Sequence, residues 1–234
     1  MQFQTKILTS VKSFKETSLV SLYNVDIIDF KDPDKGALGA MPIEKIKSCL
    51  KILPSSQETS ATIGDIDNTD GIEAKVIKLS KINIDFIKVG IFFNENKLYK
   101  LSNIKNLIRK NKKLIAVIFA DYNYSCQIVK KIKEANFDGI LIDTANKKRG
   151  NLRYFMSKKK IKNFINISKK NKLSIGLAGS LKISDINPLL KLQPDYIGFR
   201  SALCSGYKRD LDICQKSLNE VTIKFKKNLF KIAI

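Results

Sequence analysis

Eight short runs rich in β-branched residues alternate with longer amphipathic stretches along this chain, and turn residues bound each run. Runs of this length and composition predict strands, and the longer stretches predict helices between them. The predicted strands contain the sequences KILTSV, DIIDF, TSATIG, FIKVGI, LIAVIFA, GILIDTA, LSIGLAG and YIGFRS. Eight consecutive βα units close into one parallel barrel, so the predicted fold class is α/β, a single (β/α)8 TIM barrel.

The length of the chain agrees with one such barrel. It has 234 residues, 44% of them hydrophobic, and barrels of this type have roughly 250 residues. We therefore expect one domain over residues 1–234. Residues 222–234 are expected to form a C-terminal tail or to extend the last helix, where they cover the barrel or a neighbouring subunit. By analogy with other barrel enzymes, a homo-oligomer is also expected as one form of assembly.

The sequence contains no membrane-spanning or secretory signal. No apolar run approaches the roughly 20 residues that cross a bilayer, and the start MQFQTKILTS lacks the apolar stretch of a signal peptide. A soluble, cytoplasmic protein with no membrane partner is predicted.

The four cysteines are scattered, and the chain contains no histidine. Without a CxxC pair or a histidine, neither a zinc site nor a disulfide framework is indicated, and Cys49, Cys126, Cys204 and Cys214 are predicted to be ordinary, mostly buried thiols. The acidic stretch DIDNTDG at 65–71 misplaces the glycine of a calcium-binding loop and lacks its closing glutamate. We expect a strand-ending loop there and no metal.

The net charge is +21, from 43 basic and 22 acidic residues. Such a charge can indicate nucleic-acid binding, which predicts a clustered patch with interleaved aromatic side chains. The excess lysines are instead spread along the chain, and segments 109–113, 130–133 and 158–164 are predicted to lie in helices or at their ends. Solvated helix faces are therefore preferred over a nucleic-acid partner, and small anionic substrates are favoured electrostatically.

Ionisable residues occur where several predicted strands end: Asp29 and Lys31, Lys88, and Asp143 and Lys147. In a (β/α)8 barrel the C-terminal strand ends face the active site. Because histidine is absent, proton transfer or covalent chemistry here must rest on Lys, Asp, Glu, Tyr or Cys. A mechanism that uses a lysine amine as the nucleophile is therefore the first hypothesis.

Spacing and burial support this hypothesis. Asp29 and Lys31 are two residues apart on an extended segment, so their side chains share a face and a carboxylate is expected beside an amine. Asp143 and Lys147 are expected to repeat this pairing one or two strands away. Lys88 lies within the apolar run FIKVG, where an ammonium is costly unless it is paired or neutral, and burial lowers a lysine pKa. Taken singly, the aspartates could cap loops and Lys31 or Lys147 could be solvated loop residues. Their convergence at three strand ends favours a functional site.

The last two predicted strands end in LAGSL and GFRSAL, in the units that frequently bind phosphate in such barrels. Gly179 and Gly198 allow main-chain N–H groups to approach a phosphate, Ser180 adds a hydroxyl, and Arg200 offers a bidentate guanidinium. Tight turns with one structural arginine are the alternative. We interpret these four residues as a phosphate-binding site.

The segments DIIDFKDPDKGALGA, SATIGD, DFIKVG, ILIDTANK, LAGSL and GFRSALC together resemble the (5-formylfuran-3-yl)methyl phosphate synthase family, also called 4-(hydroxymethyl)-2-furancarboxaldehyde-phosphate synthase. The resemblance spans nearly the whole chain in order. It implies an enzyme of methanofuran biosynthesis that condenses two molecules of glyceraldehyde 3-phosphate. It also implies that Lys31 is the Schiff-base lysine, with Asp29, Lys88, Asp143 and Lys147 at the other catalytic positions and no external cofactor.

The chain departs from the family pattern at two places. Ala37 stands where the family often has serine, and GFRSALC replaces the more common glycine after the arginine. Neither change affects an ionisable catalytic position. A different Schiff-base aldolase acting on a sugar phosphate remains the alternative enzyme, distinguished by its product.

Overall fold

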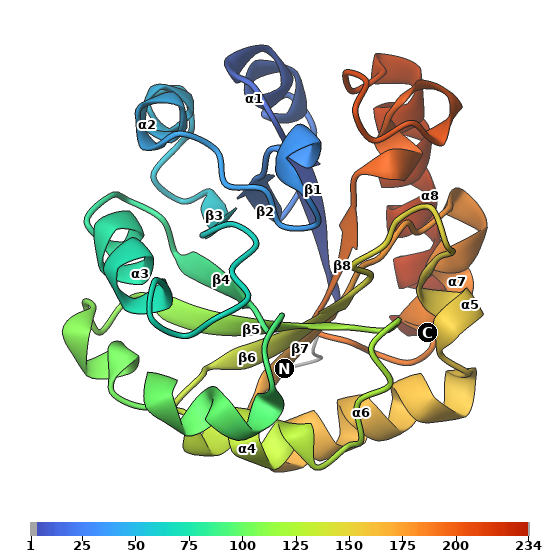
Figure 1. Ribbon diagram of the computed structural model, residues 1–234. Helices are drawn as coiled ribbons and strands as arrows, with labels where there is room; N and C mark the ends of the chain where they lie inside the picture. Colours follow the sequence, from blue (N-terminus) through green and yellow to red (C-terminus); the bar gives the residue numbers. More distant parts are fainter. Residues whose placement is uncertain (1–3, 234) are drawn as a thin grey trace.

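Eight parallel strands form a closed barrel in the computed structural model, which describes residues 4–233 (Figure 1). Each strand pairs with the next in sequence, and the last pairs with the first. The strands are β1 (Lys6–Val11), β2 (Ile27–Phe30), β3 (Glu58–Thr62), β4 (Phe86–Gly90), β5 (Lys113–Phe119), β6 (Gly139–Asp143), β7 (Ser174–Leu177) and β8 (Tyr196–Phe199). The predicted (β/α)8 barrel and its eight strands are confirmed.

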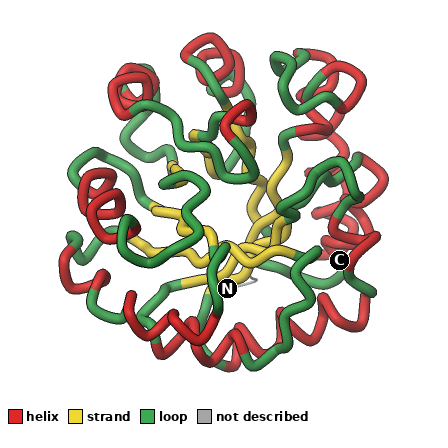
Figure 2. Tube along the Cα trace, in the orientation of Figure 1, coloured by secondary structure: helices red, strands yellow, loops and turns green. Residues whose placement is uncertain are grey.

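Helices surround the barrel on its outer side (Figure 2). The α-helices are α1 (Phe14–Val20), α2 (Ile43–Leu50), α3 (Ile72–Ser80), α4 (Ile128–Glu134), α5 (Leu152–Phe155), α6 (Lys158–Lys170), α7 (Ile186–Leu190) and α8 (Gln215–Ala233). Short 3-10 helices are η1 (Pro33–Lys35), η2 (Glu95–Leu101), η3 (Ile104–Leu107), η4 (Ile183–Asp185), η5 (Ser201–Leu203) and η6 (Ser205–Tyr207). Residues 222–233 extend the last helix, which contacts α7 and buries Val221 and Phe225; Ile234 lies outside the described residues.

One predicted helical interval has a different structure. Between β4 and β5 the chain forms η2 and η3 instead of an α-helix, and residues 109–113 form a turn and the first residue of β5. This interval is rich in asparagine, and the Asn94 side chain accepts a hydrogen bond from the Asn96 N–H at 2.9 Å. Such local side-chain bonds compete with α-helix formation. Residues 130–133 and 158–164 lie in α4 and α6, as predicted.

Two hydrophobic clusters lie on the two faces of the sheet. The larger one fills the space between strands and helices. The smaller one fills the barrel interior and includes Leu8, Ile27, Ile115, Leu141 and Tyr196. Gly176 of β7 makes room for the ring of Tyr196, because a Cβ at this glycine would lie 2.1 Å from a ring carbon. The barrel interior is thus a packed core, and a site is expected at the C-terminal ends of the strands.

The 65–70 loop, the four cysteines and the helices bear on the remaining sequence-based expectations. Residues 65–70 form the loop before α3, and within residues 4–233 no cluster of three or more His, Cys, Asp or Glu side chains is arranged to hold a metal ion. All four cysteines are free; Cys49 and Cys204 are buried, and Cys126 and Cys214 are partly exposed. None of the helices in the described part of the chain is long and apolar enough to cross a membrane.

Candidate active site

Asp29 and Lys88 form a buried ion pair inside the barrel. Asp29 is the third residue of β2 and Lys88 is the middle residue of β4, and their exposed fractions are 1% and 2%. The hydroxyls of Ser10 and Ser60 donate to the two carboxylate oxygens of Asp29 at 2.8 and 2.7 Å. Burial by itself raises the pKa of Asp29, but the charges of Lys88 and Lys31 outweigh it, so the pKa lies below its usual value. Asp29 is therefore a carboxylate.

Asp143 lies at the end of β6 between two lysine amines. Its Oδ2 is 3.5 Å from Lys31 Nζ, its Oδ1 pairs with Lys147, and the Thr144 N–H donates to Oδ1 at 2.7 Å. Burial raises the pKa of this carboxyl, but Lys147 and Lys31 hold it well below its usual range. Burial also lowers the pKa of Lys147, an effect that Asp143 opposes. The single carboxylate of Asp143 therefore pairs with the amines of both Lys31 and Lys147.

Lys31 follows directly after β2 and is 7% exposed. Burial lowers the pKa of its amine to about 7; Asp143 opposes this effect, and the positive charges of Lys147, Arg209 and Lys88 add to it. A lysine with this pKa is substantially neutral near neutral pH, and only a neutral amine can attack a carbonyl carbon. The Lys31 amine therefore meets the electrostatic requirement of a Schiff-base nucleophile.

The structure brings together all five ionisable residues predicted at the strand ends, but their pairing differs from the sequence-based expectation. Asp29 and Lys31 share the inward face, yet the ion-pair partner of Asp29 is Lys88 and that of Lys31 is Asp143. Lys31 lies beyond the end of β2, whereas Asp29 lies deeper in the barrel. Strands that are not adjacent in the barrel, β4 and β6, therefore supply partners that local spacing does not reveal. The Asp143–Lys147 pair occurs as predicted.

A small cavity of about 40 Å³ opens among these side chains. Its lining includes Ser10, Asp29, Lys31, Lys88, Asp143 and Lys147, and also Gly179, Ser180, Gly198, Arg200, Ser201 and Arg209. Its size suits the reacting end of a small substrate. The cavity thus joins the lysine and carboxylate cluster to the predicted phosphate-binding segments.

The segment after β7 presents its main chain to this cavity. Gly179 has φ of +104°, where a Cβ would lie 3.0 Å from the Thr144 side chain, and Ser180 has φ of +50°. Within residues 4–233, no acceptor meets the N–H groups of Gly179, Ser180 and Ser201. Free main-chain N–H groups at adjacent loops are suited to an anion.

Arg200 borders the same cavity, but its guanidinium is directed to other groups. Nη1 donates to Glu16 at 2.6 Å, Nε donates to the Arg209 carbonyl at 2.9 Å, and Nη2 donates to the Leu211 carbonyl at 2.8 Å. The sequence did not reveal these contacts, since Glu16 is 184 residues away.

The family model described as 4-HFC-P synthase matches residues 7–222 of this chain. The chain belongs to this family. The (5-formylfuran-3-yl)methyl phosphate synthase of Methanocaldococcus jannaschii is 32% identical over 216 residues, covering 87% of this chain and 92% of that protein. The protein of the same name from Methanosarcina acetivorans is 30% identical over 216 residues, with the same coverage. The chain is therefore an enzyme of the (5-formylfuran-3-yl)methyl phosphate synthase type.

Solved structures agree on the fold. The 3-hexulose-6-phosphate synthase of Salmonella typhimurium superposes with a TM-score of 0.68 at 15% identity, covering 96% of this synthase and all of that chain. Phosphoribosyl anthranilate isomerase of Thermus thermophilus gives a TM-score of 0.68 at 9% identity, over 95% and 99% of the two chains. At these identities the similarity concerns the barrel alone.

Two aspartates that sequence reasoning missed hold the site loops of this synthase. Asp65 accepts hydrogen bonds from the N–H groups of Ala37 and Leu38 at 2.8 and 2.7 Å. Asp121 accepts from Ala145 and Asn146, each at 2.8 Å, in the loop that carries Lys147. Each aspartate follows a predicted strand directly or closely, as in SATIGD and IFAD, which is the signal that could have identified them.

Arg209 of the loop after β8 was also missed. It lines the same cavity, and its Nη2 donates to the Gly36 carbonyl in the loop after β2 at 3.1 Å. Its sequence neighbours Lys208 and Asp210 are also charged, and no strand pattern precedes it. The sequence therefore offered no local signal that separates this arginine from surface charges.

Proposed function

We propose that this synthase condenses two molecules of glyceraldehyde 3-phosphate into (5-formylfuran-3-yl)methyl phosphate in methanofuran biosynthesis. Family membership supports the product and the pathway. Two trioses become one furan with the loss of one phosphate and two molecules of water. Carbon, phosphorus and electrons balance, so the reaction needs no oxidant, reductant or external cofactor.

The observation that carries this proposal is the buried Lys31 amine with a pKa of about 7 beside Asp143. In the neutral state this amine adds to the aldehyde of the first triose, and loss of water gives an iminium ion on Nζ. The iminium withdraws electrons from the adjacent carbon, so a proton leaves that carbon and an enamine forms. Asp143 then stabilises the positive charge on nitrogen.

The enamine carbon adds to the aldehyde of the second triose and forms the new carbon–carbon bond. Elimination of one phosphate, dehydration, ring closure and release of the Lys31 amine complete the furan. Asp29, Lys88, Asp143 and Lys147 serve as acids, bases and charge partners in these steps. The ion pairs Lys88–Asp29 and Lys147–Asp143 support these roles, since each contact allows a proton to move between the amine and the carboxylate.

One phosphate is proposed to bind where the loops after β7 and β8 meet. The free N–H groups of Gly179, Ser180 and Ser201 border the cavity there, together with the Ser180 hydroxyl. Gly198 lies close to Leu8, since a Cβ at this glycine would be 3.2 Å from Leu8 Cδ2. Arg200 borders this site.

The test is borohydride trapping with glyceraldehyde 3-phosphate, followed by intact-mass analysis and peptide mapping. We expect one reduced triose phosphate adduct on Lys31 in the wild type, no adduct in Lys31→Ala, and an undiminished adduct in Lys35→Ala. Lys35 is the matched control because it lies in the same loop with a side chain that is 56% exposed. An adduct that persists in Lys31→Ala would contradict the assigned nucleophile.

The product of the untrapped reaction tests the furan assignment separately. We expect a phosphorylated furan aldehyde with release of one inorganic phosphate per product. An adduct on Lys31 combined with an open-chain sugar phosphate would instead identify a Schiff-base aldolase and contradict the furan synthase.

A further inference from the structure

The loop between β8 and α8 is fixed to the barrel by a buried ion pair. Glu16 of α1 is 2% exposed and accepts a hydrogen bond from Arg200 Nη1 at 2.6 Å and another from the Ile213 N–H at 3.0 Å. Arg200 in turn donates to the carbonyls of Arg209 and Leu211 at 2.9 and 2.8 Å. Residues 209–213 are therefore held at several main-chain positions from inside the protein.

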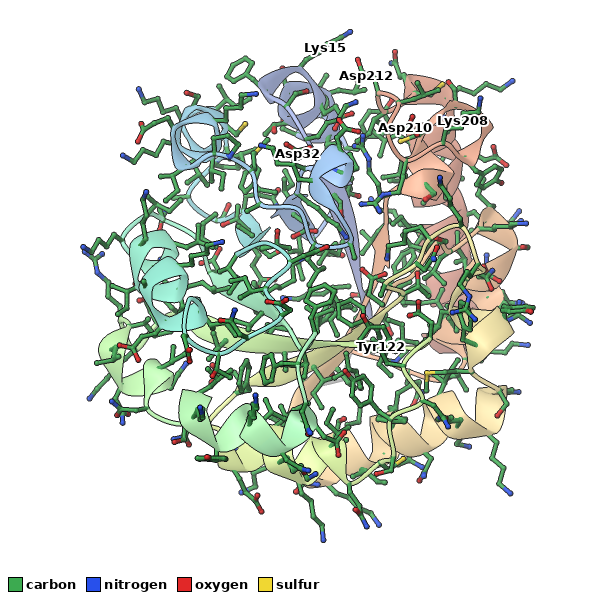
Figure 3. The ribbon with its side chains drawn as sticks, in the orientation of Figure 1. Lys15, Asp32, Tyr122, Lys208, Asp210 and Asp212 are labelled. Carbon is green, nitrogen blue, oxygen red and sulfur yellow. The ribbon has the colours of Figure 1, made fainter. Side chains whose placement is uncertain are left out.

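The outer side of the same loop is held by lysines of the segment after β1. Lys12 Nζ donates to the Asp210 carbonyl and lies 3.4 Å from Asp212, and Lys15 Nζ lies 3.6 Å from Asp212. Figure 3 shows Lys15 on α1 near Asp212, with Asp210 and Lys208 in the loop after β8. Contacts on both sides fix the main chain, which leaves the Arg209 side chain as the part that reaches the active site.

The Arg209 guanidinium joins the loop after β8 to the loop after β2 at the edge of the cavity. It reaches the Gly36 carbonyl of the loop after β2 at 3.1 Å, and in the described part of the chain this is its one side-chain hydrogen bond. A guanidinium has five N–H donors. Most of them are therefore available to a ligand in the cavity that Arg209 lines.

The charge of the cluster also favours an anion at this point. Lys31, Lys147 and Arg209 surround one carboxylate, Asp143, while Lys88 is paired with Asp29. Even with the Lys31 amine neutral, the charges of Lys147 and Arg209 together exceed that of Asp143, and an added anion compensates the excess. A guanidinium with free N–H donors binds a phosphate dianion in a bidentate manner.

This inference rests on the proposed function, in which each turnover brings two phosphates into the site, one on each triose. The N–H groups of Gly179, Ser180 and Ser201 provide for one of them. We propose that Arg209 binds the phosphate of the second triose, and that the Glu16–Arg200 pair is a positioning device that directs Arg209 to the edge of the cavity. Arg200 then acts through the loop carbonyls, while the phosphate contact belongs to Arg209.

The first test compares Arg209→Gln with Lys208→Gln, which removes the neighbouring exposed charge. We expect Arg209→Gln to keep the borohydride-trapped adduct of the first triose on Lys31 but to reduce furan phosphate formation about 10- to 100-fold, since one charge-assisted contact is lost. Arg209→Lys should recover part of this loss, and Lys208→Gln should resemble the wild type. Equal turnover in Arg209→Gln and Lys208→Gln would overturn the assignment, as would loss of the adduct together with turnover.

A binding measurement separates this inference from the proposed function. Phosphorus NMR titration with inorganic phosphate should detect two sites in the wild type and the loss of one in Arg209→Gln. If the wild type makes no furan but Arg209→Gln still loses a phosphate site, the proposed function fails and the anion site stands. Unchanged phosphate binding in Arg209→Gln would refute the anion site, whatever the product.

The positioning role has its own readout. Glu16→Gln keeps the shape of the side chain but removes the charge that holds Arg200. We expect it to reproduce the turnover loss of Arg209→Gln without affecting the Lys31 adduct, and the double variant should be no worse than Arg209→Gln alone, because both changes remove one interaction. Additive losses in the double variant would contradict a shared role, and thermal unfolding of each variant identifies a loss of stability.

Discussion

At the N-terminal ends of the even-numbered strands, aspartates bind the main chain of the preceding strand, whereas at the C-terminal ends of β2 and β6 aspartates bind lysine amines. The carboxylates of the first group accept N–H hydrogen bonds at 2.6–2.8 Å; the pairs are Asp26 with Ile7, Asp85 with Thr59, Asp138 with Leu114 and Asp195 with Ile175. The second group, Asp29 and Asp143, has no such role in strand pairing. One residue type thus stabilises one end of the barrel and activates the other.

This difference follows from what each carboxylate faces. A main-chain N–H cannot give up its proton, so the four N-terminal aspartates make permanent bonds that join neighbouring strands. A buried lysine amine can exchange its proton, and its charge is costly to bury. The C-terminal end therefore holds groups whose charges can change, and burying these charges costs stability.

The largest effect is expected when this comparison is tested at β6, which has Asp138 directly before its first residue and Asp143 as its last. Asp143→Asn removes the charge that holds Lys31 and Lys147, so we expect the rate of furan phosphate formation to fall by about 10³-fold, as for other groups that hold a nucleophile. The control is Asp138→Asn at the start of the same strand, which should retain most activity at a temperature where it is folded. Similar losses in both variants would remove the functional distinction between the two ends.

The next largest effect concerns stability. Asp138→Ala leaves the Leu114 N–H without its 2.7 Å acceptor and removes the partner of Lys105. We expect the free energy of unfolding to fall by about 2–3 kcal/mol, because a buried donor loses a charged acceptor. Urea unfolding followed by circular dichroism measures this change, and a change close to zero would show that these aspartates do not stabilise the barrel.

The strands, and the grouping of Asp29, Lys31, Lys88, Asp143 and Lys147 at one end of the barrel, could be predicted because they depend on local patterns. Alternating segments identified the eight strands, and Lys88 within FIKVG indicated a buried amine. The charge pairing could not be predicted, since Asp29 meets Lys88 only when β2, β3 and β4 are in register around the barrel.

The role of Arg200 depends on the same closure. Its partner Glu16 lies at the other end of the chain, and β1 meets β8 only in the closed barrel. The position of Arg200 after Gly198 suggested a phosphate contact. In the structure the Arg200 guanidinium donates hydrogen bonds to Glu16 and to loop carbonyls. Both arginines line the cavity, but these long-range contacts occupy the donors of Arg200, whereas Arg209 makes one side-chain hydrogen bond among the described residues.

A gradual effect is expected in the dependence of stability on pH. Lys31 loses its proton near pH 7 in the folded state and near its ordinary pKa of 10.5 in the unfolded chain. Between these values the unfolded state binds more protons, so the free energy of unfolding rises with pH, by up to about 1.4 kcal/mol per pH unit. Lys31→Met should remove this contribution and be more stable than the wild type at pH 7, with a difference that narrows toward pH 10. Parallel curves for the two proteins would contradict the lowered pKa.

The smallest effect is expected at Asp26, the most exposed of the four N-terminal aspartates. Its carboxylate accepts from the Ile7 N–H at 2.7 Å, but solvent can replace it there because residue 26 is exposed. We expect Asp26→Ala to lower the free energy of unfolding by about 0.5–1 kcal/mol, less than Asp138→Ala, with unchanged activity. Urea unfolding of the two variants under one condition makes the comparison. An equal cost at both positions would show that the carboxylate bond itself, and not its burial, determines how strongly this end of the barrel is held.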